Sequence, residues 1–164
     1  MIKKQRGQNR KLKQLIHNIN NIAPFTNTER QYEAFAVPCG RFLSSPKTSG
    51  KIKTSFCKAF IKKSEEFIND KPQHLSFCKV VTVINTNDFW KSQIIIFYDK
   101  EYYLGFWERN TAEQAWEPIK SADRSFAKER NIKTALKEKG YCETVFEEDS
   151  AQKSILWFYG DIHA

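Results

Sequence analysis

The sequence predicts an α+β domain in which a mainly antiparallel sheet carries two N-terminal amphipathic helices on one face. Apolar residues recur at helical spacing near the N-terminus, β-branched and aromatic runs fill the centre, and turn residues separate those runs. The chain has 164 residues, 40% of them hydrophobic, with only 6 Gly and 5 Pro. This composition excludes disordered and fibrous classes and predicts a single domain over residues 1–164.

Two helices are expected in the N-terminal half. The first spans residues 9–22, after a basic arm at residues 1–8, and its apolar face holds Leu12, Leu15, Ile16, Ile19 and Ile22. The second is expected over residues 48–69, with Ser45 or Thr48 as its N-cap. Each helix has an apolar side that suits packing on a sheet.

Six segments have the composition of strands: 32–37, 77–84, 93–98, 102–107, 141–146 and 154–159. The run from Gln93 to Tyr98 is apolar on both faces and is therefore expected inside the sheet, covered on both sides. Residues 113–119 fit a short helix, and residues 132–139 fit another that ends at Gly140.

Charge is distributed unevenly along the chain. Residues 1–63 contain 14 Lys and Arg but only two acids, a net charge of +12, whereas residues 64–164 contain 13 against 17, a net charge of −4. A basic half attracts polyanions or acidic partners by long-range steering. The alternative explanation for the excess of positive charge is a coding bias that favours Lys, since 20 of the 27 cations are Lys.

The cations of the two helices fall opposite their apolar faces. We expect them to form a surface for nucleic acid or another polyanion, consisting of Lys3, Lys4, Arg6, Arg10, Lys11, Lys13, Lys51, Lys58 and Lys62. Only two are Arg, so binding should depend weakly on sequence. The same surface also suits an acidic protein partner, and this protein would then be an immunity-type or regulatory interaction module. The alternative without a binding function is that these cations form the solvated side of two amphipathic helices.

A small-molecule pocket is the third hypothesis, and it would make the protein an enzyme of unknown reaction. Aromatic and polar residues at strand ends can line such a pocket, here Trp90, Gln93, Arg109 and Trp116. The alternative is that these aromatics complete the core. No nucleophile elbow, kinase signature or dinucleotide fingerprint is present. The stretch from Ser45 to Lys51 is not a phosphate loop, because Ser45 stands where the first glycine is required and Ile52 where a Ser or Thr must follow the lysine.

The sequence predicts no metal, no cofactor and no membrane span. The three histidines are scattered, the four cysteines form no CxxC pair, and no apolar run approaches the roughly 20 residues of a membrane helix. The charged N-terminus lacks the apolar region of a secretion signal. We expect reduced thiols and a cytoplasmic location.

Ordered motifs over residues 3–120 carry a family resemblance. The most specific is Trp90 with Ser92-Gln93 and the apolar run after it, and the others are Tyr32, Pro38, Phe42, Lys47-Thr48, Asn69-Asp70-Lys71-Pro72, Val80-Val81, Phe106 to Asn110 and Trp116. Together they resemble a bacterial family of small proteins, domain of unknown function 3916, although Ser49-Gly50 stands where we expect a proline. That family has no assigned activity, so the resemblance implies a bacterial cytosolic origin and supplies no catalytic residues.

Overall fold

The computed structural model describes residues 2–85, 89–112, 142–147 and 153–161. In chain order the elements are α1 (Ile2–Asn20), β1 (Tyr32–Ala36), α2 (Gly50–Asn69), β2 (Lys79–Asn85), the 3-10 helix η1 (Phe89–Lys91), β3 (Gln93–Phe97), α3 (Lys100–Ala112), β4 (Cys142–Glu147) and β5 (Lys153–Gly160). The α+β class predicted from the sequence is confirmed.

The five described strands form one antiparallel sheet in the order β1-β3-β2-β5-β4. β3 lies between β1 and β2, where Ile95 faces Ala34 on one side and Val81 on the other. Ile94 to Phe97 are all buried. The prediction that this run lies inside the sheet, covered on both faces, is therefore confirmed.

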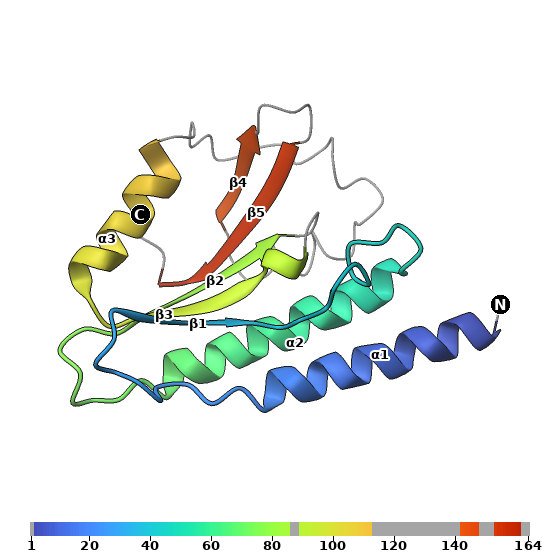
Figure 1. Cartoon of the computed structure of the whole chain (residues 1–164), viewed down its shortest axis with the longest axis horizontal. Coiled ribbons are helices and arrows are strands. Elements are labelled where there is room, and N and C mark those ends of the chain that lie inside the picture. The colour runs from blue at the N-terminus through green and yellow to red at the C-terminus, as the bar shows by residue number, and fades with distance from the viewer. Residues whose placement is uncertain (1, 86–88, 113–141, 148–152, 162–164) are drawn as a thin grey trace.

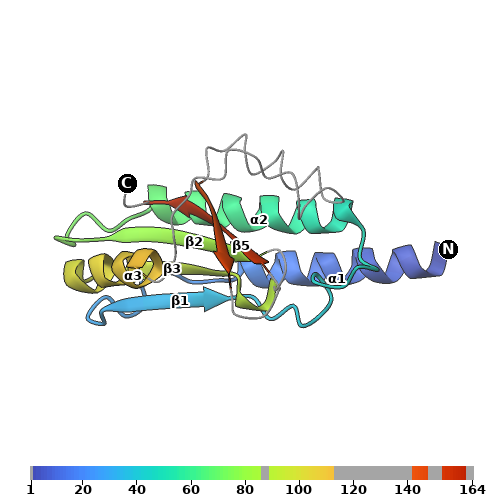
Figure 2. The same cartoon turned by 90° about the horizontal axis from the view of Figure 1, so that it is seen from above.

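Helices cover both faces of the sheet (Figure 1). α1 and α2 run side by side beneath it, and they share one core cluster with the sheet, whose members include Leu15, Ile19, Phe56, Phe60, Ile94, Ile96 and Trp157. α3 lies on the opposite face (Figure 2), where a second cluster holds Val81, Val83, Ile95, Phe97, Tyr103, Trp107 and Phe158. Successive side chains of a strand point to opposite faces of the sheet, so neighbouring residues of β2 and β3 belong to different clusters.

Both N-terminal helices begin at different residues from those predicted. α1 begins at Ile2, so most of the expected basic arm is helical. Ser49 is the N-cap of α2, and its hydroxyl accepts the Ile52 N–H at 3.3 Å. Thr48 cannot serve as the cap, because its hydroxyl donates to the Phe42 carbonyl and is buried in that contact.

The predicted strand at residues 102–107 is wrong, because these residues belong to α3. Asp99 caps this helix, since its carboxylate accepts the Tyr102 N–H at 2.7 Å and its carbonyl accepts the Tyr103 N–H at 3.1 Å. Tyr103 and Trp107, four residues apart, are both buried on the sheet. Packing at helical spacing therefore outweighs the strand propensity of an aromatic run.

The remaining predicted strands are confirmed within one or two residues at each end as β1, β2, β3, β4 and β5. The helices expected at residues 113–119 and 132–139 lie outside the described residues.

Candidate functional site

Seven cationic side chains of α1 and α2 form what we call the basic helix face: Arg6, Arg10, Lys11, Lys13, Lys51, Lys58 and Lys62. All seven are exposed. They are seven of the nine residues that the sequence singled out for polyanion binding. Lys3 and Lys4 also belong to α1, but their side chains lie outside the described part of the chain.

On α1 the cations form a row along the solvent side. Arg6, Arg10 and Lys13 follow one another at spacings of four and three residues, so they share one side of the helix. The opposite side buries Leu15 and Ile19 in the core. The helix sequence contains six Lys and Arg and no acid, so no charge within α1 neutralises the row.

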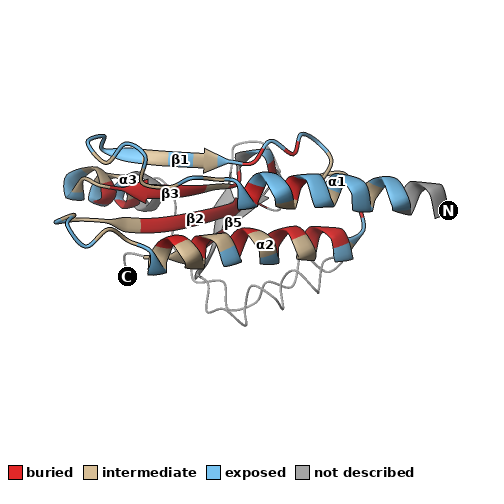
Figure 3. Cartoon of the chain, turned by 90° about the horizontal axis from the view of Figure 1, so that it is seen from below, coloured by how far each residue is buried: buried red, intermediate tan, exposed pale blue. Residues whose placement is uncertain are grey.

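On α2 the row consists of Lys51, Lys58 and Lys62, at spacings of seven and four residues. These three side chains lie opposite the buried residues of the helix, which include Phe56 and Phe60. The only acids of α2 are in its last two turns. Figure 3 shows the two helices next to each other on the same side of the sheet, with exposed residues along α1.

Contacts near their N-terminal ends connect α1 to the loop that leads into α2. The Gln8 side chain donates to the Lys47 carbonyl at 2.9 Å. The Lys11 ammonium lies 5.1 Å from the centre of the Phe42 ring, a cation–π contact. These contacts place the N-terminal half of α1 beside the loop that leads into α2.

Near the C-terminal end of α2, by contrast, a cation is neutralised. Lys63 pairs with Glu66 at 3.0 Å and also donates to the Asn20 carbonyl at the end of α1, at 3.2 Å. No side chain of the basic helix face forms such an ion pair with another described residue. Among the described residues, therefore, none of the seven charges is neutralised by an ion pair.

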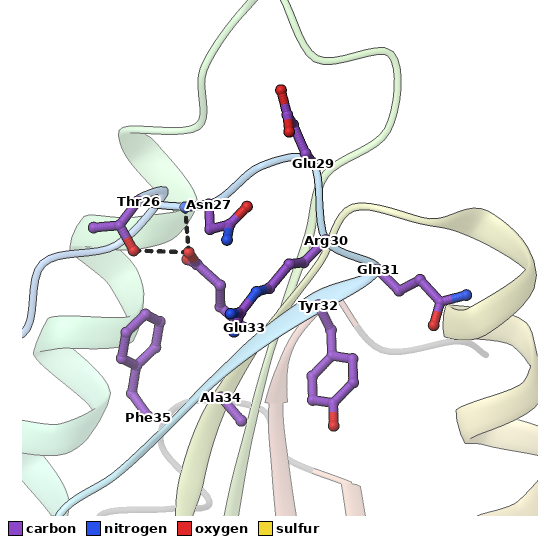
Figure 4. Close-up of a pocket in the computed structure, with 9 residues that line it drawn as sticks. All are labelled: Thr26, Asn27, Glu29, Arg30, Gln31, Tyr32, Glu33, Ala34 and Phe35. Atoms are coloured by element: carbon purple, nitrogen blue, oxygen red, sulfur yellow. Dashed lines mark hydrogen bonds between the residues drawn. The ribbon is translucent and has the colours of Figure 1, made fainter.

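An open depression of about 960 Å³ lies elsewhere, along the loop before β1 and the free edge of that strand (Figure 4). Its lining comprises Thr26, Asn27, Glu29, Arg30, Gln31, Tyr32, Glu33, Ala34 and Phe35. The Glu33 carboxylate is occupied by four donors within the fold, at 2.5 to 3.1 Å. Glu33 therefore holds a loop in place, and its carboxylate is not free to act as an acid or base in the depression.

The structure does not gather the four predicted pocket residues around this depression. Trp90 is on η1 and Gln93 begins β3, so these two lie at one end of that strand. Arg109 belongs to α3, which follows the other end of β3, and its side chain lies outside the described part of the structure. Trp116 also lies outside the described residues. The pocket hypothesis gains no support from this placement.

Metal ligands and membrane-spanning helices are two further features that the described ranges could contain. No group of three or more His, Cys, Asp and Glu side chains there is placed to hold a metal ion. None of the helices described there has the length and apolarity that crossing a membrane requires.

Sequence reasoning missed two exposed cations that adjoin the basic helix face, Arg41 and Lys47, both in the loop before α2. Their signal was available, because residues 34–64 contain seven Lys and Arg and no acid. Attention to predicted helices alone left the connecting loop out.

The fold is that of an α+β protein in which two helices with exposed cations pack on one face of an antiparallel sheet. The sequence profile of the family described as "Protein of unknown function (DUF3916)" matches residues 13–161, so the chain belongs to that family. The match extends to the end of β5, well beyond the resemblance seen over residues 3–120. No curated protein and no solved structure matches significantly.

Proposed function

We propose that this protein binds nucleic acid or a chemically similar polyanion through the basic helix face. The observation that carries the proposal is the pair of exposed cationic rows on two adjacent helices, with no ion-pair partner among the described residues. Neutralising phosphates releases condensed counterions, and this release supplies most of the affinity in non-specific binding.

The spacing of the rows suits several simultaneous phosphate contacts. At 1.5 Å rise per residue, Lys51, Lys58 and Lys62 lie about 10 and 6 Å apart along the axis of α2. The axes of packed helices are about 8–10 Å apart, so the two rows lie on closely neighbouring helices. A phosphate backbone that crosses both helices meets several cations. With only Arg6 and Arg10 able to form forked contacts to bases, the proposed binding is weakly sequence-specific.

Charge reversal tests the proposal with a matched control. The double variant Lys58→Glu/Lys62→Glu and the control Arg30→Glu/Lys100→Glu each change the net charge by the same amount at exposed residues, but only the first pair is on the basic helix face. Fluorescence anisotropy with random-sequence duplex DNA at low salt should show at least tenfold weaker binding for the first variant and little change for the control.

Equal losses in both variants would show that only total charge matters, and this would overturn the assignment to the helices. Absence of binding by the unmodified protein at about 50 mM salt would contradict the proposal altogether. The acidic protein partner considered above would then be the remaining hypothesis for this surface.

A further inference from the structure

Trp90 is held out in solvent by a well-anchored turn. Its side chain is 55% exposed, although its neighbour Phe89 is fully buried and packs edge-on against Phe56 of α2, with ring centres 5.8 Å apart. The Ser92 hydroxyl accepts the Asn85 N–H at 2.9 Å, and the Ser92 N–H donates to the Phe89 carbonyl at 3.1 Å. Buried contacts on both sides therefore fix the backbone that presents the indole.

A single exposed apolar side chain does not by itself identify a site. The second observation is its position relative to charge. Ala36 at the end of β1 faces Gln93 at the start of β3, so the loop after β1 leaves the sheet at the end where η1 lies. Figure 1 shows this loop and η1 at the same end of the sheet, toward the N-terminal half of α2.

Two of the segments that meet at this end, the loop after β1 and the start of α2, are basic. Exposed Arg41 and Lys47 lie in the loop, and exposed Lys51 lies in the first turn of α2. The whole stretch 34–64 contains no acid. An exposed indole at the same end of the sheet as an acid-free cationic segment is a combination that suits single strands, because bases stack on the ring while cations hold the phosphates.

We propose that Trp90 is a stacking platform for an unpaired base of a single-stranded nucleic acid whose phosphates are held by Arg41, Lys47 and Lys51. This inference rests on the proposed function and specifies its ligand. The bases of a duplex are paired and stacked on one another, so they leave no face for the indole. Trp90 should therefore contribute to binding of single strands and contribute little to binding of duplexes.

Titrations with two nucleic acids and one base-free polyanion test the inference. The probes are a random single strand of about 12 nucleotides, a duplex of the same length, and inorganic polyphosphate. The variants are Trp90→Ala, Trp90→Phe and the control Leu104→Ala, which removes an exposed apolar side chain on α3. Trp90→Ala should weaken single-strand binding by about 5- to 150-fold, Trp90→Phe should retain much of the affinity, and Leu104→Ala should change nothing. Binding of the duplex and of polyphosphate should be unaffected by all three.

The failures of the two proposals are distinguishable. If Trp90→Ala binds the single strand as tightly as the unmodified protein, the stacking inference is overturned while polyanion binding stands. If Trp90→Ala weakens binding of polyphosphate as much as that of the single strand, base stacking is likewise overturned. If the unmodified protein binds none of the three probes at low salt, both proposals fail. Circular dichroism of each variant shows whether the fold is intact.

Discussion

The phenol of Tyr98, directly after β3, donates a hydrogen bond of 2.8 Å to the carboxylate of Glu33 on β1. The same carboxylate accepts the N–H of Phe25 at 3.1 Å and that of Asn27 at 2.5 Å. Phe25 has a φ of +60°, a conformation that non-glycine residues rarely adopt. Glu33 thus ties the sheet edge to the strained turn that connects α1 with β1, and so it positions the helix that carries four of the seven cations of the basic helix face.

Replacement of Glu33 by Ala should therefore destabilise the fold. Charge-assisted hydrogen bonds contribute about 1.5–3 kcal/mol each but are not additive, so we expect the free energy of unfolding to fall by about 3 kcal/mol. Urea denaturation measures it. Glu29→Ala, in the same loop but exposed, should change the value by less than about 0.5 kcal/mol. Similar values for the two variants would contradict the role assigned to Glu33.

A buried hydroxyl pair joins α2 to the sheet. Thr82 of β2 donates to the Ser64 hydroxyl at 2.5 Å, and Ser64 donates to the Phe60 carbonyl at 2.9 Å. Ser64→Ala leaves the Thr82 hydroxyl buried without this acceptor, which should lower the free energy of unfolding by about 1–3 kcal/mol.

A double-mutant cycle isolates this pair. Thr82→Val in the Ser64→Ala background removes the orphaned donor, so the double variant should be no less stable than Ser64→Ala alone. Strictly additive losses measured by urea denaturation would show that the two hydroxyls do not depend on each other.

Gly160, at the end of β5, should tolerate no side chain. Its φ is +104°, and a Cβ there would lie 2.3 Å from the Val80 carbonyl oxygen. Gly160→Ala should therefore lower the free energy of unfolding by more than about 2 kcal/mol in thermal or urea denaturation. Gly7→Ala is the matched control, because that glycine is in α1 with open space around it and Ala should stabilise the helix by up to about 1 kcal/mol. An undiminished stability of Gly160→Ala would contradict the close approach of β5 and β2.

Stability should decline in strongly alkaline solution. Burial, followed by the hydrogen bond of 3.0 Å to Glu65, raises the pKa of Tyr159 from 10.0 to about 12. Burial and the bond to Glu33 likewise raise the pKa of Tyr98. A raised pKa means that the folded state keeps a proton which the unfolded state releases, so this stability is fully present below about pH 10.

Urea denaturation between pH 8 and 12 measures the effect. The contribution of Tyr159 should be lost as the pH rises from about 10 to about 12, and Tyr159→Phe should make the decline shallower. A decline of the same steepness in Tyr159→Phe would contradict the assignment.

The sequence predicted those parts of the fold in which spacing determines structure. Apolar positions three and four residues apart identified α2, and an uninterrupted apolar run identified β3. Strand propensity assigned α3 wrongly, because Tyr103 and Trp107 are aromatic residues, which favour strands. Only the cap by Asp99 and the burial of both side chains on one side of α3 reveal a helix.

The candidate site divides in the same way. The cationic rows follow from helical periodicity, since a charge opposite a buried face must be exposed. The exposure of Trp90 next to the fully buried Phe89 does not follow from the sequence pattern. Adjacent aromatic residues compete for the same core, and tertiary packing selects which of them is buried.

The salt dependence of binding tests the central claim, phosphate binding by the basic helix face, most directly. Each neutralised phosphate of a duplex contributes about −0.9 to the slope of log K against log salt concentration, so four or more contacts should give a slope of roughly −4 or steeper. Lys58→Glu/Lys62→Glu should make the slope shallower by about 2, and Arg30→Glu/Lys100→Glu should leave it unchanged. A slope near zero for the unmodified protein, or one that the first variant leaves unchanged, would contradict the claim.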